Sequence, residues 1–112
     1  MHELSIAMGI VQIAEKEAKK AQVDRVLAID LEIGTLSGVE IEALNFAWPM
    51  AVAGSVLQMA EKRIHLIEAQ AKCLDCGTDF KMMHFYDTCP ICGSPFKNIY
   101  KGKELRVKSL EV

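Results

Sequence analysis

The sequence predicts an α+β fold, in which two helices pack on a small mixed β-sheet and a cysteine-containing ribbon is inserted as a separate module. Two observations predict the body of this fold. Apolar residues near the amino terminus recur with the period of a helix, and those of residues 25–33 alternate as in a strand. A third observation predicts the ribbon, since all four cysteines lie between residues 73 and 92. Helices laid over a small sheet form a two-layer architecture.

Length and charge limit the class of protein. The chain has 112 residues, which suits one domain with a small appendage. Hydrophobic residues make up 51%, yet no apolar run approaches the length that spans a membrane. The formal net charge of −2 offers no basic face, so we expect neither a membrane nor a nucleic-acid partner. The start Met1-His2-Glu3 lacks the cationic and apolar regions of an export signal, and we therefore expect the protein in the cytoplasm.

The first predicted elements are a helix and a strand. From Leu4 to Ala21 the apolar residues follow a helical period, and lysines and glutamates occupy the opposite side of the helix. Residues 25–33 then alternate between apolar and other residues, which indicates a strand with one buried side. Two glycines, Gly34 and Gly38, end this strand.

A second apolar helix is predicted after the glycines. Ser37 is its expected N-cap, because Glu40 stands three residues further on and completes a capping box. The apolar pattern continues to Val52. Pro49 lies inside it and should kink or divide the helix, because proline has no N–H for the preceding turn.

The rest of the chain reads as short strands around the cysteines. Residues 56–62 are ambiguous and fit a short helical turn. We expect an α+β domain made of residues 1–71 together with 104–112, and a zinc-ribbon domain made of residues 72–103. Further strands are expected at 63–71, 96–100 and 105–112.

The cysteines form two similar motifs. One reads Cys73-Leu74-Asp75-Cys76-Gly77 and the other reads Cys89-Pro90-Ile91-Cys92-Gly93. Two residues between sulfurs allow a tight turn to direct both thiolates at one point, and the following glycine lets backbone amides approach the sulfurs. Two such turns supply four soft ligands in a tetrahedron, which is the arrangement of closed structural zinc sites.

Two other readings of the cysteines stay open. Disulfides would need an oxidising compartment, which the absence of an export signal disfavours. A rubredoxin-type iron site uses the same C-x-x-C-G motifs. Colour separates the metals, because iron–thiolate proteins are red and zinc proteins are colourless. In either case all four positions are filled by sulfur, so the site serves the architecture and not catalysis.

The first three residues, Met1-His2-Glu3, can also chelate a metal ion. The terminal amine of Met1, the amide of His2 and its imidazole could close adjacent chelate rings. Alternatively, the amides of His2 and Glu3 could bind together with the imidazole, and the Glu3 carboxylate could add an oxygen from the side. Both schemes place several nitrogens in one plane, a geometry that favours Ni(II) or Cu(II) over Zn(II). Of these two ions, Cu(II) would bind with the higher affinity.

Several motifs spread over the whole chain resemble the HypA/HybF family of hydrogenase nickel-incorporation proteins. The match follows the order of the family's motifs, and their combination is far more specific than any single one. The matching stretches are Met1-His2-Glu3-Leu4-Ser5, Ile33-Gly34-Thr35-Leu36-Ser37-Gly38-Val39-Glu40, Ala43-Leu44-Asn45-Phe46, Ala53-Gly54-Ser55, Cys89-Pro90-Ile91-Cys92-Gly93-Ser94, Gly102-Lys103-Glu104-Leu105 and Ser109-Leu110-Glu111. Pro49 departs from the pattern, because relatives are expected to have an ordinary helix former there.

The resemblance implies a nickel metallochaperone. Such a protein receives Ni(II) and, with the GTPase HypB, delivers it to the large subunit of nickel–iron hydrogenase, and in some bacteria it also serves urease maturation with the urease accessory proteins. His2 matches the family's nickel ligand, and Glu3 matches the neighbour that contributes its backbone nitrogen. Glu40 matches an acidic position near that terminus and is a candidate for further ligation. The resemblance also implies that the structural Zn(II) ligands are Cys73, Cys76, Cys89 and Cys92.

Other residues have simpler readings. His84 is expected to be a surface residue of a loop, although it could ligate nickel if the ribbon folds back towards His2. His65 is expected to be structural, and the pair Met82-Met83 is expected to pack. Trp48 and Phe46 are expected core aromatics. An exposed Trp48 would instead suit a partner interface.

No catalytic constellation is visible, so we do not expect an enzyme. The sequence shows neither a nucleophile triad nor a phosphate loop nor a paired-carboxylate cleft. A zinc-ribbon adaptor for RNA or proteins is the main alternative, and a rubredoxin-like electron carrier is the third. Both a monomer and a homodimer are compatible with the sequence, because the insertion invites exchange of a terminal strand.

Overall fold

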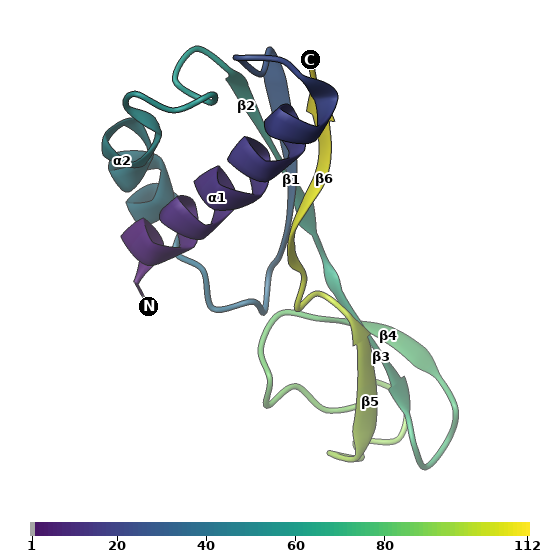
Figure 1. Cartoon of the computed structure of the whole chain (residues 1–112). Coiled ribbons are helices and arrows are strands. Elements are labelled where there is room, and N and C mark those ends of the chain that lie inside the picture. Colours follow the sequence, from purple (N-terminus) through teal and green to yellow (C-terminus); the bar gives the residue numbers. More distant parts are fainter. Residues whose placement is uncertain (1) are drawn as a thin grey trace. The chain divides into compact units, whose positions relative to one another are not determined.

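A computed structural model describes residues 2–112 of the chain, and Met1 lies outside the described residues. It has the predicted α+β composition (Figure 1). No helix among the described residues is both long and apolar enough to span a bilayer. The elements are α1 (Glu3–Ala21), β1 (Ala28–Gly34), α2 (Ile41–Val52), β2 (Glu61–Ile67), β3 (Ala69–Cys73), β4 (Asp79–Met82), β5 (Lys97–Lys101) and β6 (Leu105–Glu111).

The chain divides into two compact units. Among the described residues, the first contains residues 2–31, Val39–His65 and Arg106–Val112, and the second contains Glu32–Gly38 and Leu66–Leu105. The sequence-based division, with residues 1–71 and 104–112 in one domain and 72–103 in the other, stays a prediction.

Helices α1 and α2 pack against each other in the first unit. The buried residues of α1 recur at three- and four-residue intervals, as the amphipathic pattern predicts. Most of them are alanines, and small side chains let a neighbouring helix approach closely. From α2 the core receives Trp48 and Leu44, together with residues of its last turn.

The strand order of the first sheet is β2-β1-β6. Residue numbers rise together along β1 and β2, which are therefore parallel, and run in opposite directions along β1 and β6, which are antiparallel. The sheet is mixed, as the sequence predicts. The backbone hydrogen bonds that define these directions are Glu61 N to Leu27 O, Thr35 N to Ile67 O, Leu27 N to Glu111 O and Gly34 N to Glu104 O.

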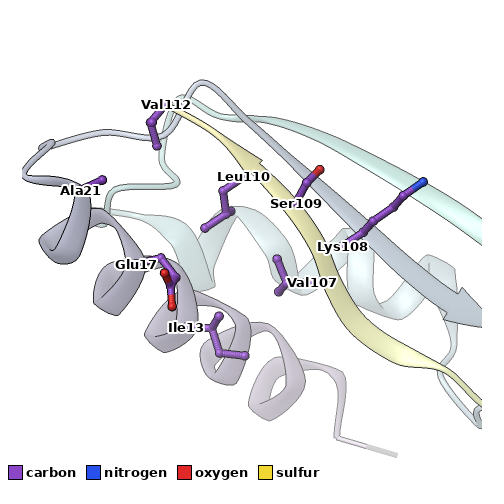
Figure 2. A pocket seen from close by; sticks show the side chains of 8 residues that line it. All are labelled: Ile13, Glu17, Ala21, Val107, Lys108, Ser109, Leu110 and Val112. Atoms are coloured by element: carbon purple, nitrogen blue, oxygen red, sulfur yellow. The ribbon is translucent and has the colours of Figure 1, made fainter.

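Helix α1 and the edge strand β6 border an open groove of about 430 Å³. Figure 2 shows Ile13 and Glu17 of the helix on one side of this groove, with Val107 and Leu110 of the strand on the other. The exposed side of α1 therefore contributes to a shallow surface beside the sheet.

The second unit is built on the sheet β4-β3-β5. Both neighbours run antiparallel to β3, which places Ala71 opposite Phe80 on one side and Ile99 on the other. The buried cluster of this unit is small and includes Leu36, Phe80 and two of the cysteines. With so few large apolar residues, this unit needs another source of stability.

Two glycines allow a close approach of backbones in the second unit. A Cβ on Gly34 would lie 2.0 Å from the carbonyl oxygen of Gly102. Gly102 itself has φ +112° and a Cβ there would lie 2.4 Å from the Cα of Ala69. Larger residues at either position would displace backbone, which gives a physical reason for both glycines.

The expected N-cap of α2 was wrong. The helix begins at Ile41 with Glu40 as its N-cap residue, and no side-chain cap is formed by that residue. Gly38 has φ +83°, a left-handed conformation that separates Ser37 from the helix. The Glu40 amide finds its acceptor in the Glu3 carboxylate of α1, a contact that the local sequence pattern does not contain.

The effect expected of Pro49 is corrected in part, since α2 continues through Pro49 to Val52 without division. Proline removes one helical N–H donor. Because Pro49 lies in the last turn of α2, only three residues of the helix follow it. Trp48 is buried as expected, whereas Phe46 is 86% exposed and is not a core aromatic.

The strand expected at residues 63–71 is interrupted at Glu68, where β2 of one sheet ends before β3 of the other begins. Strand β4 was not predicted, because only four residues form it. Met82 packs as expected, but its neighbour Met83 is 78% exposed.

Candidate metal centres

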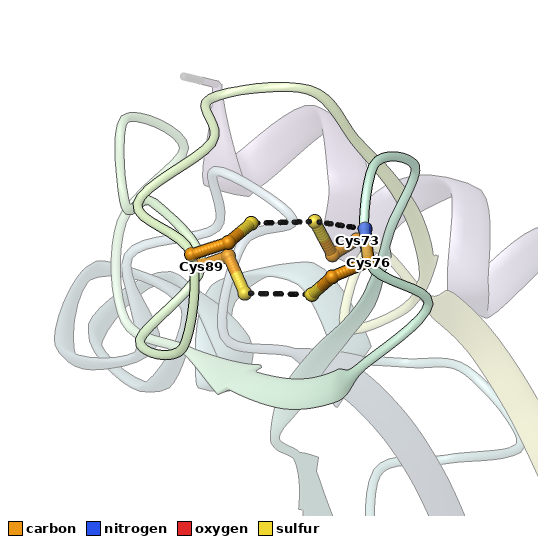
Figure 3. Close-up of side chains that lie close together, drawn as sticks. Cys73, Cys76 and Cys89 are labelled. Atoms are coloured by element: carbon orange, nitrogen blue, oxygen red, sulfur yellow. Dashed lines mark hydrogen bonds between the residues drawn. The ribbon is translucent and has the colours of Figure 1, made fainter.

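The four cysteine sulfurs converge on one point in the second unit. All their sulfur atoms lie within 4.8 Å of one another. The sulfur of Cys73 lies 3.5 Å from that of Cys92, and the sulfur of Cys76 lies 3.6 Å from that of Cys89. Figure 3 shows the side chains of Cys73 and Cys76 facing that of Cys89. A tetrahedron with metal–sulfur bonds of about 2.3 Å has sulfurs about 3.8 Å apart. The donor set therefore fits a tetrathiolate metal ion.

All four cysteines are free thiols in the structure. The sulfur–sulfur distances exceed the length of a disulfide bond, which is about 2.05 Å. Each motif forms the same turn, in which the glycine amide bonds the carbonyl of the first cysteine: Gly77 to Cys73 and Gly93 to Cys89. Both glycines have positive φ, and a Cβ on either would meet no atom within 4 Å. The left-handed backbone of the turn therefore explains these glycines, and the expected close approach to the sulfurs does not. The repeated turn explains why the two motifs present their sulfurs in matching geometry.

Hydrogen bonds favour ionisation of two of these thiols, those of Cys73 and Cys76, whereas the hydrogen bond with Cys73 and burial raise the pKa of Cys92 to about 12. The Thr78 hydroxyl, whose oxygen is 3.2 Å from the Cys76 sulfur, and the Thr78 amide lower the pKa of Cys76 to about 6. The Cys76 amide likewise lowers the pKa of Cys73. Because several thiolates cannot accumulate in one place without a counter-charge, the arrangement suits a cation that stabilises them together.

Residues outside the C-x-x-C motifs also support the site. Ser94 is buried, donates a hydrogen bond to Asp75 and accepts one from the Phe96 amide, so it joins the two cysteine turns. Thr78 and Ser94 were missed by sequence reasoning. In the sequence, each of these residues is distinguished only by its position directly after a cysteine turn. Polar residues are common at such positions, so the position alone does not identify a residue that supports the metal site.

The structure places His2 and Glu3 at the start of α1. His2 is exposed and is the N-cap residue, and its carbonyl accepts the first helical hydrogen bond from Ile6 at 3.1 Å. The amides of residues 2 and 3 therefore form no helical hydrogen bond that a metal would have to break. Met1, whose amine enters one chelation scheme, lies outside the described residues.

Glu3 and Glu40 meet where α1 and α2 both begin. Glu3 is only 8% exposed, and its Oε2 accepts the Glu40 amide at 3.1 Å. This bond and, to a smaller degree, its own amide lower the pKa of Glu3, against a raising effect of burial. A carboxylate at two helix N-termini also neutralises their partial positive charge. Glu40 points its own side chain to solvent as the N-cap residue of α2.

The cysteines and the first residues form separate candidate sites. Among residues 2–112, the cysteines are the one group of three or more His, Cys, Asp or Glu side chains placed to hold an ion. Both chelation schemes at His2 rely on backbone nitrogens beside the imidazole. His84 is an exposed loop residue stacked on Tyr86, as expected, and His65 bonds Asp30 at 2.7 Å.

The fold and the converging thiols define a small α+β protein with a candidate tetrathiolate metal site. Comparison with known proteins specifies it further: the HypA family model, described as hydrogenase/urease nickel incorporation, metallochaperone, matches residues 1–112. The chain belongs to the HypA family. It is thus a nickel-incorporation metallochaperone and hydrogenase maturation factor, and not an enzyme.

Relatives and solved structures match the chain along its full length. The hydrogenase maturation factor HypA of Parabacteroides distasonis is 48% identical over all of this chain and 97% of its own length. That of Azotobacter chroococcum is 44% identical over all of this chain and 99% of its own. The solution structure of the nickel metallochaperone HypA from Helicobacter pylori has a TM-score of 0.70 at 29% identity, covering 99% of this chain and 97% of that one.

Proposed function

We propose that the protein binds Ni(II) at its first residues and, with a HypB-type GTPase, delivers it to the large subunit of nickel–iron hydrogenase. His2 is the imidazole ligand, and the amide of Glu3 is a further nitrogen ligand. Glu40 is an additional candidate ligand. The single observation that carries this proposal is the exposed His2 at the start of α1, in a chain of the nickel-incorporation family.

The position of His2 suits a cargo that must be released. An exposed imidazole and backbone nitrogens can be reached by a competing ligand on a partner protein. The start of a helix carries partial positive charge, which disfavours a bound cation unless amides lose their protons. Binding therefore releases protons, and acidification weakens it. Such a site holds nickel without enclosing it.

The cysteine site serves a different purpose. We propose that Cys73, Cys76, Cys89 and Cys92 hold a structural Zn(II), for which the separations of their sulfurs fit. The bound ion would neutralise the thiolates and join the two cysteine turns. The site has no open position for substrate, so it takes no part in nickel transfer chemistry.

The proposed cellular setting follows the family. We propose that the protein acts in the cytoplasm and serves hydrogenase, with urease and its accessory proteins as a possible second recipient system. The family description names both hydrogenase and urease nickel incorporation. Assembly of hydrogenase in extracts, compared with assembly of urease, identifies the recipient.

The substitution His2→Gln tests the nickel site. Loss of the imidazole should weaken Ni(II) binding by roughly a hundredfold or more, while zinc content and thermal stability are unchanged. Calorimetric titration with Ni(II) measures the affinity, and metal analysis measures zinc. His84→Gln is the matched control, because it removes another exposed histidine, and it should leave the affinity within about twofold. Unchanged binding by His2→Gln refutes the proposed site.

A further inference from the structure

We propose that the Glu3 carboxylate is a positioning group for the nickel site, which acts through the Glu40 amide and does not itself ligate nickel. This inference rests on the proposed function, because it concerns how the nitrogens of residues 2 and 3 are held. Its basis is the burial of Glu3 and the hydrogen bond that its side chain accepts from Glu40, the N-cap residue of α2.

The Glu3 side chain is already engaged in the structure. Its Oε2 lies 3.1 Å from the Glu40 nitrogen, and the residue is 8% exposed while both His2 and Leu4 are exposed. A buried carboxylate that left the Glu40 amide would leave that donor without this acceptor and would itself need new partners. Ligating nickel through this oxygen is therefore disfavoured.

The same contact fixes the backbone that carries the proposed ligands. Glu3 is the first residue of α1 and Glu40 is the N-cap residue of α2, so the hydrogen bond joins the starts of two helices that pack together. The chelating nitrogens belong to Glu3 itself and to the residue before it in the chain, His2. A backbone held in place loses less conformational entropy when it closes a chelate ring, and this favours binding.

A second carboxylate of α1 makes a similar but solvent-exposed contact far from His2. Glu15 Oε2 accepts the Val56 amide at 2.9 Å, just after the end of α2. Helix α1 therefore accepts backbone amides at both ends of α2 through Glu3 and Glu15. Removing Glu15 loosens the pairing of the helices without touching the start of α1, which makes it the matched control.

The experiment compares four variants of the full chain: Glu3→Gln, Glu3→Ala, Glu15→Ala and His2→Gln. For each, calorimetry gives the dissociation constant of Ni(II), and amide exchange by NMR gives the protection of Glu40. Gln keeps an oxygen acceptor for the Glu40 amide and Ala does not. Glu3→Ala should lose Glu40 protection and bind Ni(II) roughly tenfold more weakly. Glu3→Gln should keep protection and bind at least about fivefold more tightly than Glu3→Ala.

Three results would overturn the inference. Equal weakening by Glu3→Gln and Glu3→Ala would mean that the carboxylate charge or a carboxylate–nickel bond matters, and not the acceptor. Equal weakening by Glu15→Ala would mean that general loosening of the helices is responsible. Full affinity in Glu3→Ala would mean that the anchor is irrelevant to nickel.

Failure of the proposed function has a different signature. If His2→Gln binds Ni(II) as tightly as the parent, the ion is held elsewhere. The exchange measurements still decide the structural part of the inference in that case: Glu40 protection must fall in Glu3→Ala and persist in Glu3→Gln. Equal protection in both variants contradicts the anchor whatever the nickel site is.

Discussion

The candidate ligands differ in how the chain holds each residue. Cys73 is 2% exposed and its sulfur accepts the amide of Cys76 at 3.4 Å, so it is held before any ion arrives. His2 is exposed and forms no side-chain cap of its helix. A fixed ligand retains its ion, whereas a ligand with free rotamers pays an entropic cost on binding and exchanges more readily. The difference matches a permanent zinc ion and a transient nickel ion.

An extension of the amino terminus separates the two chelation schemes at His2. Residues placed before Met1 convert its amine into an amide. If this amine is a ligand, one chelate ring is lost and Ni(II) binding weakens roughly tenfold or more, whereas ligation by the amides of His2 and Glu3, as proposed above, keeps the affinity. The measurement is calorimetric titration of a protein with a cleavable extension, before and after cleavage. Zinc content is the control and should not change. An extension that keeps the affinity would assign the ion to the amides of His2 and Glu3 with the imidazole.

At the scale of elements, Asp30 joins the three strands of the first sheet. It lies on β1 and is 13% exposed. It accepts Arg63 Nε at 3.0 Å and His65 Nε2 at 2.7 Å from β2, and the Ser109 hydroxyl at 2.9 Å from β6. These bonds, with that from Arg63 first, hold the pKa of Asp30 far below its ordinary range. The network was not predicted, because it depends on which strands become neighbours.

The Asp30 network predicts a pH-dependent stability. Because the pKa of Asp30 is lower in the folded than in the unfolded chain, its contribution is complete above pH about 4 and is lost as the pH falls further. Asp30→Asn should lower the midpoint of thermal unfolding at pH 7 by several degrees. The difference between variant and parent should shrink below pH about 4.

Thermal unfolding from pH 7 down to strongly acidic buffers measures this difference for both proteins. Since acid also protonates the cysteines of both, only the difference between them is interpreted. Glu68→Gln is the control, because the pair of Glu68 with Lys81 is exposed on both sides and should contribute little. A difference that does not change with pH contradicts the role of Asp30.

At the scale of the whole molecule, the predictable features were those with a local signal. The period of α1, the alternation in β1 and the spacing of the cysteines each depend on a few neighbouring residues. The expected cap at Ser37 failed because the real partner of Glu40 is 37 residues away in the chain, on another helix. Contacts of this kind follow from tertiary packing, which short patterns do not encode.

The same reasoning applies to the sites. Four cysteines could be assigned to one site because each motif brings two sulfurs together by itself. For Glu3 the sequence left open a direct ligand role for the side chain, and only its burial indicates an anchor. Phe46 and Met83 show the limit for single apolar residues, since composition alone does not say which face of an element is covered.

Removal of the proposed structural zinc should affect the two units unequally. The second unit buries few large apolar side chains, and two of its buried residues are the metal-binding candidates Cys73 and Cys89. The first unit has a core of its own, to which Ile10, Leu44 and Trp48 contribute. Structural zinc contributes roughly 10–16 kcal/mol to the folding of small metal-dependent modules, which is more than such a cluster supplies. Cys76→Ser should therefore lose zinc and unfold the second unit while the first stays folded.

Amide exchange by NMR, with metal analysis, measures this outcome residue by residue. Protection should disappear in β3–β5 of Cys76→Ser and persist in α1 and α2, because the helices are stabilised by their mutual packing and not by the sulfurs. Cys76→Ser is compared with Ser55→Ala, which removes a hydroxyl from the first unit and leaves the thiols intact. Loss of protection in both units at once would show that the chain folds as one cooperative body in which the metal stabilises the helices too.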